Sequence, residues 1–285
     1  MNIISSTLFS LFFLNFLNPS FGQKNENDFV EYLYNAERFE LLKTYKQHVE
    51  TLDSLDYDSN LLNFYVGKAY YHQQKHDSSN SYFEQVVAGG KVGESKFLIG
   101  INAIFLQDYT LAKNTLTSTT FTADELSNLK NFELAGISLL ERDYGAFSAY
   151  DHQITTDYYF FEEGRKSLQQ IKTDLMNYKE KSPFLAGLYS AVLPGAGKFY
   201  AGKKGQGIYS LVISSLLAFQ AIESYQKAGF NSARFIIYGG LFSLFHVGNV
   251  WSSALSVKKY NEEFYEAVDY RIKLDLHLPI RSIFN

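Results

Sequence analysis

Two histidines are the first candidates for chemistry in this sequence. His72 and His76 lie four residues apart, a spacing at which two helical side chains can bind one metal ion. No third ligand accompanies them, and they fall at an expected junction between a helix and a turn. We therefore predict a solvated pair and no metal site. The chain contains no cysteine, which excludes disulfides, thiolate metal sites and cysteine nucleophiles.

A short acidic segment has the initial spacing of a calcium-binding loop. Asp56, Asp58 and Asn60 occupy alternate positions, as the first calcium ligands do. Such a loop needs glycine at its sixth position and glutamate at its twelfth, where this chain has Leu61 and Gly67. Calcium binding is therefore not predicted here.

A glycine-rich segment contains the letters of a nucleotide-binding loop. Residues 197–203 fit the pattern G-x-x-x-x-G-K, but Lys204 stands where serine or threonine would bind magnesium. No strand is expected before this segment, and an apolar helix follows it. No Ser/His/Asp arrangement or carboxylate pair supports catalysis elsewhere. We predict that the protein is not an enzyme and requires no cofactor.

Charge and hydropathy divide the chain into two parts. Residues 25–181 are polar and charged with periodic aromatics, whereas residues 182–257 carry few charges. The net charge is -4 and no basic face stands out, so nucleic acid is not expected as a partner.

The first 22 residues have the pattern of a secretion signal. An apolar core covers residues 3–17, and Ser20 and Gly22 supply small side chains before a cleavage point at Gln23. The core is too short to cross a bilayer comfortably. No lysine or arginine precedes it, so a retained N-terminal anchor is the alternative to export.

Aromatic residues recur in the polar part at the period of helical hairpins. Phe64, Phe97 and Phe132 lie 33 and 35 residues apart, and Gly67 and Gly100 follow the first two by three positions. Periods of this length are typical of stacked helix pairs. We also expect a degenerate pair over residues 27–52, with Phe29 and Tyr32 in the equivalent positions, and a terminal helix over residues 158–178.

These offsets resemble the tetratricopeptide repeat, in which small residues let two helices approach closely. The tryptophan and terminal proline of that family are absent, and Ser79 stands at its second-helix alanine. The resemblance implies a concave surface that binds a protein or peptide partner, lined by Phe64, Lys68, Tyr71, Phe97, Ile101 and Ile104. Packing between repeats is the alternative role of these side chains, and periodic aromatics favour it.

Two uncharged, largely apolar runs predict a helical hairpin in a lipid bilayer. They cover Gly205–Ile222 and Phe235–Val257, and each is long enough to span the hydrocarbon core. Small residues recur along both runs, which favours close helix packing. His246 and Asn249 lie in the second run, where polar side chains are candidates for function. A hydrogen bond between helices is their simpler role, because the runs contain no carboxylate.

The segment before the first run is predicted to form a glycine-hinged turn at the membrane surface, flanked by lysines. Its residues are Pro194, Gly195, Gly197, Phe199, Tyr200 and Gly202. The pattern is similar to the two-transmembrane-helix domain family, whose first helix follows a Gly-rich Phe-Tyr-x-Gly segment, and to bacterial envelope proteins with such a segment after an exported helical region. Charged residues that many family members carry around the second helix are absent here, so no partner of that family is implied.

The number of membrane crossings stays open. With a cleaved signal and two spans, the lysines flanking the hairpin would lie outside, against the positive-inside tendency. A third crossing by residues 183–197 removes this conflict, and we favour it. That segment has only 15 residues, so a re-entrant segment and a surface helix are the alternatives.

Together these features predict an all-α protein made of a tetratricopeptide-like helical-repeat solenoid and a C-terminal transmembrane helical hairpin. The expected parts are a signal peptide (1–22), the repeat domain (23–181), a membrane domain (182–260) and a C-terminal tail (261–285), in which Arg271–Ile280 alternates as an amphipathic strand.

The expected function is that of a scaffold or adaptor in the inner membrane. Its exported, periplasmic repeats would bind a protein or peptide in envelope assembly; the outer membrane is the second possible location. The alternative function is a small transport or pore-forming component that uses the glycine-rich segment and the face of His246 and Asn249. The sequence predicts no oligomeric state.

Overall fold

The computed structural model of this protein describes residues 24–51, 57–155 and 159–284. Every regular element in these ranges is a helix and no strand occurs there, which confirms the predicted all-α class. The predicted signal peptide (1–22) and Asp56 of the acidic segment lie outside the described residues.

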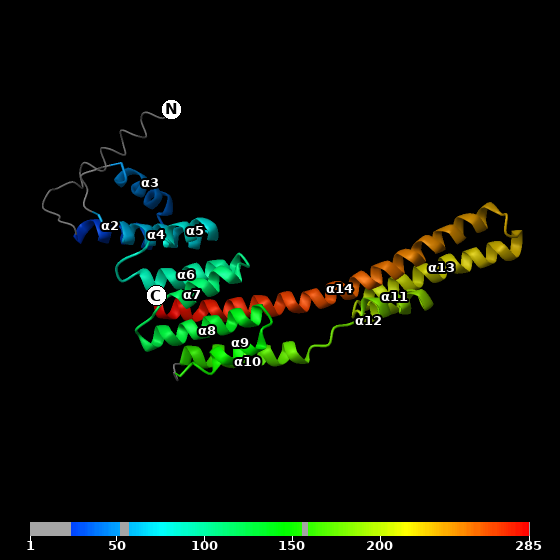
Figure 1. Ribbon diagram of the computed structural model, residues 1–285. Helices are drawn as coiled ribbons and strands as arrows, with labels where there is room; N and C mark the ends of the chain where they lie inside the picture. The colour runs from blue at the N-terminus through cyan, green and yellow to red at the C-terminus, as the bar shows by residue number, and fades with distance from the viewer. Residues whose placement is uncertain (1–23, 52–56, 156–158, 285) are drawn as a thin grey trace, which may run out of the picture. The chain divides into compact units, whose positions relative to one another are not determined.

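The chain divides into two compact units, which we describe separately (Figure 1). The helix-pair unit comprises residues 1–169 and 272–285, and the hairpin unit comprises residues 170–271. The divisions therefore fall inside α10 and α14, and the last residues of the expected tail belong to the first unit.

Nine helices begin in the helix-pair unit as far as it is described. They are α2 (Lys24–Asn35), α3 (Phe39–Val49), α4 (Ser59–His72), α5 (His76–Phe83), α6 (Val92–Phe105), α7 (Tyr109–Ser118), α8 (Asp124–Leu140), α9 (Tyr144–Asp151) and α10 (Tyr159–Asn177). Helix α10 coincides within a residue with the terminal helix expected over residues 158–178. The hairpin unit continues with α11 (Pro183–Val192), α12 (Ala196–Tyr200), α13 (Lys204–Ala228) and α14 (Ala233–Phe284).

Four successive helix pairs are closed by the same three-residue turn. Between α2 and α3, α4 and α5, α6 and α7, and α8 and α9, the middle residue has φ between 54° and 63°; these residues are Glu37, Gln74, Gln107 and Arg142. In each turn the next backbone N–H donates to the carbonyl oxygen five residues earlier, at 2.8 to 3.0 Å. This is the hydrogen bond that ends a helix at a left-handed residue. The backbone therefore repeats more regularly than the side chains do.

The turns also correct the register of the first pair. Gly67 and Gly100 lie seven residues before their turn residues, and the residue seven before Glu37 is Val30. Val30 is buried, whereas Tyr32, expected at this position, is exposed. The degenerate first pair is therefore present, with Val30 facing its neighbour.

Close packing of α4 on α5 depends on Gly67. A β-carbon at this position would lie 2.7 Å from the ring of Phe83, which is fully buried. Ser79 Oγ donates a 2.9 Å hydrogen bond to the Gly67 carbonyl oxygen, so α5 is held to the backbone of α4. At Gly100 a β-carbon would make an ordinary 3.6 Å contact with Leu116. Only the first of these glycines is required by the packing.

Two helices of the hairpin unit are long and apolar enough to cross a membrane, α13 and α14. In the most apolar 18-residue stretch of each helix, only 22% of α13 and 6% of α14 is buried. This low burial distinguishes them from core helices of a soluble fold. They run side by side and are joined by a turn in which Gly229 has φ of 75° (Figure 1). The predicted hairpin is thus formed, and it offers two candidate membrane-spanning helices.

The favoured third crossing is not formed by a helix of sufficient length. Helix α11 has 10 residues, about 15 Å, which is half of the ~30 Å hydrocarbon core. It ends where residues 193–195 lead into α12, and its Ser190 Oγ donates a 2.8 Å hydrogen bond to Ser253 Oγ of α14. Helix α11 is therefore a short helix packed against the hairpin.

The strand predicted for Arg271–Ile280 is wrong, because this segment is the last part of α14. Its apolar residues alternate, but every fourth one also falls on a single helical face. That face, formed by Ile272, Leu276 and Ile280, is buried, whereas the leucines between them are exposed. A strand would need a partner edge, and the described residues contain none; the helix-pair unit instead offers a helical surface.

Candidate functional site

The C-terminal part of α14 lies against the first helices of successive pairs, and this surface is the first candidate site (Figure 1). One contact is at Gly136 of α8, where an added β-carbon would come within 2.3 Å of the Leu276 side chain. Leu276 is fully buried there. Gly136 therefore provides the space that the C-terminal helix occupies.

Two further contacts join this segment to α4 and α6. Tyr71 Oη of α4 lies 2.7 Å from His277 Nδ1, and the two rings stack with centroids 5.9 Å apart. Phe97 of α6 contacts Phe284, with ring centroids 5.7 Å apart. Residues 272–284 thus contact the first helix of three successive pairs, which together form one surface.

Both partners of the Tyr71–His277 hydrogen bond are neutral at pH 7. Burial lowers the pKa of the His277 imidazole, and the positive charge of Arg281 lowers it further. Burial also raises the pKa of the Tyr71 hydroxyl far above its usual value. The contact is therefore a hydrogen bond between a phenol and a neutral imidazole.

The six residues predicted to bind a partner occupy three kinds of position. Tyr71 and Phe97 contact the C-terminal helix, and Lys68 forms an ion pair with Glu94 at 3.2 Å. The other three are fully buried: Phe64, Ile101 and Ile104. Binding of another protein through this set stays a prediction, and within this chain two of its members hold residues 272–284.

The histidine pair has structural roles. His76 Nδ1 lies 2.6 Å from Asn102 Oδ1, and the ring stacks on Phe105. The Asn102 amide donates in turn to Asn80 Oδ1 at 2.8 Å. His76 is half-buried and belongs to a polar network, while His72 is exposed. No cluster of three or more metal-ligating side chains occurs among the described residues.

The described members of the acidic segment also have backbone partners. Asp58 Oδ1 accepts a 3.1 Å hydrogen bond from the Leu61 N–H and so caps α4. Asn60 Oδ1 accepts from the N–H groups of Val87 and Ala88, at 2.9 and 3.1 Å. These side chains organise the start of α4 and the loop after α5.

Glu133 of α8 is a fully enclosed carboxyl group beside this surface. Its Oε1 has no hydrogen-bond partner among the described residues, and burial raises its pKa well above the usual range. After burial, the negative charge that Glu133 carries once it ionises is a further cause of the raised pKa of Tyr71. Glu133 is therefore protonated well above the pH at which an exposed glutamate ionises.

The glycine-rich segment is the second candidate site. Gly195 has φ of 87°, and a β-carbon there would lie 2.3 Å from the Gly207 carbonyl oxygen. A β-carbon on Gly197 would lie 1.9 Å from the Ala186 carbonyl oxygen, and one on Gly207 would lie 2.9 Å from the Phe199 ring. These glycines bring α12 into backbone contact with α11 and α13.

Tyr200 ties the same turn to the residues before α11. Its hydroxyl oxygen accepts a 3.2 Å hydrogen bond from the Ser182 N–H, and its carbonyl oxygen accepts one of 3.0 Å from Lys181 Nζ. Gly202 has φ of 79° with open space around it, so its glycine is required by conformation alone. Pro194 lies in the break between α11 and α12. Within the predicted turn, Ala196–Tyr200 form the short helix α12. The location of this segment at a membrane surface stays a prediction.

A cleft of about 350 Å³ opens beside this turn, between α13 and α14. Lys198 Nζ donates a 2.8 Å hydrogen bond to Ser210 Oγ at its edge. Burial lowers the pKa of the Lys198 ammonium group, and no described carboxylate lies within ion-pair distance of it. Asn249 also lines the cleft and is only 6% exposed, and neither of its amide atoms has a hydrogen-bond partner among the described residues.

His246, the other predicted intramembrane polar residue, has a partner. Its Nε2 lies 3.1 Å from the Ala191 carbonyl oxygen, so the ring connects α14 to the end of α11. This is the interhelical hydrogen bond that the simpler interpretation expects, and Asn249 lacks an equivalent one.

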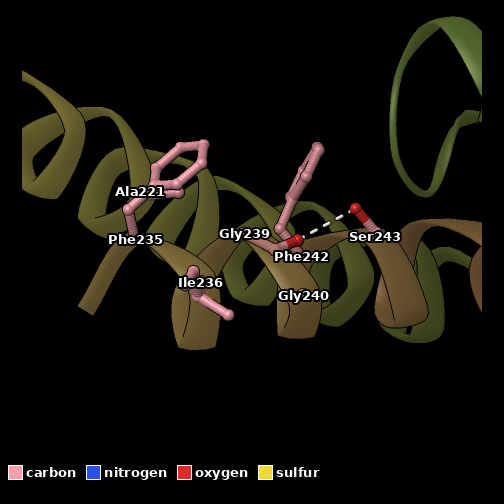
Figure 2. Close-up of a pocket in the computed structure, with 7 residues that line it drawn as sticks. All are labelled: Ala221, Phe235, Ile236, Gly239, Gly240, Phe242 and Ser243. Atoms are coloured by element: carbon pink, nitrogen blue, oxygen red, sulfur yellow. Dashed lines mark hydrogen bonds between the residues drawn. The ribbon is translucent and has the colours of Figure 1, made fainter. Parts of the chain in front are cut away.

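A second cavity, of about 370 Å³, lies nearer the hairpin turn (Figure 2). Its lining is aromatic, aliphatic or small: Ala221, Phe235, Ile236, Gly239, Gly240, Phe242 and Ser243. The only polar side chain, Ser243, donates its hydroxyl to the Gly239 carbonyl oxygen at 2.9 Å. The cavity therefore presents an apolar surface without free donors.

Two important positions escaped the sequence analysis. Gly136 carries no local signal of its contact with Leu276, although the four-residue spacing of apolar residues in 272–280 could have indicated a helix. Lys198 is recognisable in the sequence only as a flanking charge, because its approach to Ser210 depends on how α12 folds back.

No protein-family model, curated protein or solved structure matches this chain, so both family resemblances are hypotheses about it.

Proposed function

We propose that this protein is a membrane-anchored adaptor whose helix-pair unit binds an amphipathic helix of a partner protein. The main support is the C-terminal helix itself, which lies on the first helices of successive pairs and buries every fourth residue. A surface that accommodates this helix has the groove and the apolar character to accommodate another. Residues 272–284 then compete with the partner.

The polar contacts of the C-terminal helix indicate what the partner helix would carry. Beside the apolar face, His277 meets Tyr71, and Asp275 Oδ2 accepts a 2.6 Å hydrogen bond from Ser167 Oγ. A partner helix would reproduce these contacts if it had an apolar residue at every fourth position and a polar residue on each side of the middle apolar residue. Hydrogen bonds at such positions set register, because a misplaced helix leaves them unpaired.

The tetratricopeptide resemblance and the four equivalent turns support a repeat architecture for this unit. The two candidate spans support anchoring in a membrane, and the signal-like N-terminus supports export. On this basis we place the protein in the inner membrane, with a periplasmic helix-pair unit that acts in envelope assembly. The transport or pore alternative has less support, because the apolar runs 205–222 and 235–257 hold no carboxylate and His246 is engaged with Ala191.

Peptide binding to the full chain tests the proposal. A labelled peptide of residues 268–285 is titrated into Leu276→Asp protein in detergent, and fluorescence anisotropy is measured. The aspartate cannot be buried against Gly136, so the chain's own helix leaves and the peptide binds with saturation. Wild-type protein, whose surface is occupied, binds the peptide at least tenfold more weakly.

Leu278→Asp is the matched control, because Leu278 is 59% exposed on the same helix. This variant should behave like the wild type. If Leu276→Asp protein keeps its helical circular dichroism but does not bind the peptide, the segment is only part of the core and the adaptor proposal fails.

A further inference from the structure

We propose that the cleft at Lys198 binds the phosphate group of an anionic phospholipid. The inference rests on one part of the proposed function, that α13 and α14 lie in a bilayer, and it is independent of any partner of the helix-pair unit. Three features of one cleft support it: a cation with no counterion and an amide with no hydrogen-bond partner in the described part of the chain, and an apolar wall.

The cation is Lys198. Its ammonium group is partly buried and donates one hydrogen bond, to the neutral Ser210 hydroxyl, which leaves two donors free. The other lysines near this turn differ from it: Lys203 lies 3.6 Å from a Glu263 carboxylate oxygen, and Lys204 is exposed and does not line the cleft. A phosphate oxygen at the cleft would supply the anion that Lys198 lacks.

Asn249 supplies the second recognition group. Burying an amide without hydrogen bonds is unfavourable, so an unpaired asparagine in an apolar helix calls for a ligand. Its NH₂ group can donate to a second phosphate oxygen or to a polar headgroup, while Lys198 binds the first. The Gly195–Gly207 contact places α12, and hence Lys198, against the start of α13.

The remaining wall of the cleft favours a lipid over a soluble anion. Tyr209, Ile213, Leu244 and Phe245 line it with aromatic and aliphatic side chains. An acyl chain can lie along them. Ser210 is six residues, or about 9 Å, beyond Lys204 at the start of α13, which is the depth of the headgroup boundary if Lys204 lies at the membrane surface.

The only tryptophan of the chain provides a fluorescent probe beside this cleft. Trp251 lies next to the cleft residue Ser252 and is 70% exposed. The full chain is reconstituted in phosphatidylcholine vesicles that contain brominated phosphatidylglycerol or, in parallel, brominated phosphatidylcholine at the same mole fraction. We expect the brominated phosphatidylglycerol to quench Trp251 fluorescence as if its local concentration were about fivefold higher than its mole fraction. This factor corresponds to the attraction of one lysine for a lipid phosphate.

Variants separate a built site from general attraction between lysines and an anionic surface. Lys198→Gln keeps a donor for Ser210 but removes the charge, and Asn249→Leu removes the amide; both should abolish the enrichment. Lys204→Gln removes the same charge at the same end of α13 outside the cleft, and should retain at least half of it. Equal losses in Lys198→Gln and Lys204→Gln would overturn the proposal, as would equal quenching by both lipids in the wild type.

The same quenching experiment distinguishes other possible occupants of the cleft. If millimolar inorganic phosphate reverses the enrichment at constant ionic strength, the cleft is a site for soluble anions and the lipid assignment is wrong. If the enrichment disappears as the protein-to-lipid ratio rises, a second copy occupies the cleft, which also overturns it. If neither brominated lipid quenches Trp251, the bilayer location fails, and with it the anchoring part of the proposed function.

Discussion

Gly67 and Gly100 occupy equivalent positions in neighbouring helix pairs, seven residues before their turns, yet they have different surroundings. Gly67 faces the edge of an aromatic ring in a fully packed interior, and Gly100 faces the branched end of Leu116 at normal contact distance. The difference arises because Phe83 fills the space that a side chain on α4 would need.

This difference predicts opposite effects of the same substitution. Gly67→Ala should lower the free energy of unfolding by about 1–3 kcal/mol, because neither the Phe83 ring nor the α4 backbone can move away freely. Gly100→Ala should leave it unchanged or raise it by up to about 1 kcal/mol, through the restricted unfolded chain. Thermal unfolding of the full chain in detergent, followed by circular dichroism, measures both. Equal effects would contradict the packing of α4 on α5.

At the scale of elements, the short helix α12 is held by glycines and not by a large apolar face. Its backbone approaches α11 at Gly197 and α13 at Gly195, and Ser190 Oγ accepts a 2.9 Å hydrogen bond from the Gly197 N–H. The contacts of α12 with α11 and α13 are therefore made by backbone atoms, and the absence of side chains at the glycines allows the close approach.

Gly197→Ala should separate α12 from α11, because its β-carbon would overlap the Ala186 carbonyl oxygen. We expect a loss of about 1–3 kcal/mol in the stability of the hairpin unit, visible as faster amide hydrogen exchange in α11 and α12. Gly205→Ala, in the first turn of α13 with no atom within 4 Å, should leave the exchange rates unchanged. Protection of α11 in the Gly197→Ala protein would show that the contact is not formed.

At the scale of the whole molecule, Glu133 links stability to pH. The pKa of its carboxyl group is raised on folding, so the native state retains a proton that the unfolded state releases above about pH 4.5. Stability from this group is therefore complete below that pH and decreases as the pH rises toward the folded-state pKa.

Glu133→Gln removes the titrating group with little change of shape. The unfolding temperature of this variant should exceed that of the wild type at pH 7 to 8, and the difference should shrink as the pH falls to about 3.5, where the wild-type carboxyl is neutral in both states. Glu84→Gln, at an exposed position, should show no such pH-dependent difference. A constant difference at all pH values would mean that Glu133 does not titrate between native and unfolded states.

The sequence by itself determined the all-α class, the helical hairpin and the period of the helix pairs. These follow from local properties: apolar runs long enough to span a bilayer, aromatic spacings near 34 residues, and glycines where the backbone turns. The four equivalent turns between paired helices cannot be recognised from the sequence, because their left-handed positions carry residues other than glycine: Glu37, Gln74, Gln107 and Arg142.

Only the tertiary structure decided what residues 272–284 do. Their apolar pattern fits both a strand and a helix, and the choice depends on which surface is available to bury it. Gly136, more than 130 residues away in the chain, provides that surface for Leu276. The same holds for Lys198, whose isolation from carboxylates and proximity to Asn249 arise from the packing of α12, α13 and α14. Contacts between distant residues depend on backbone approach, which no local pattern of residue types specifies.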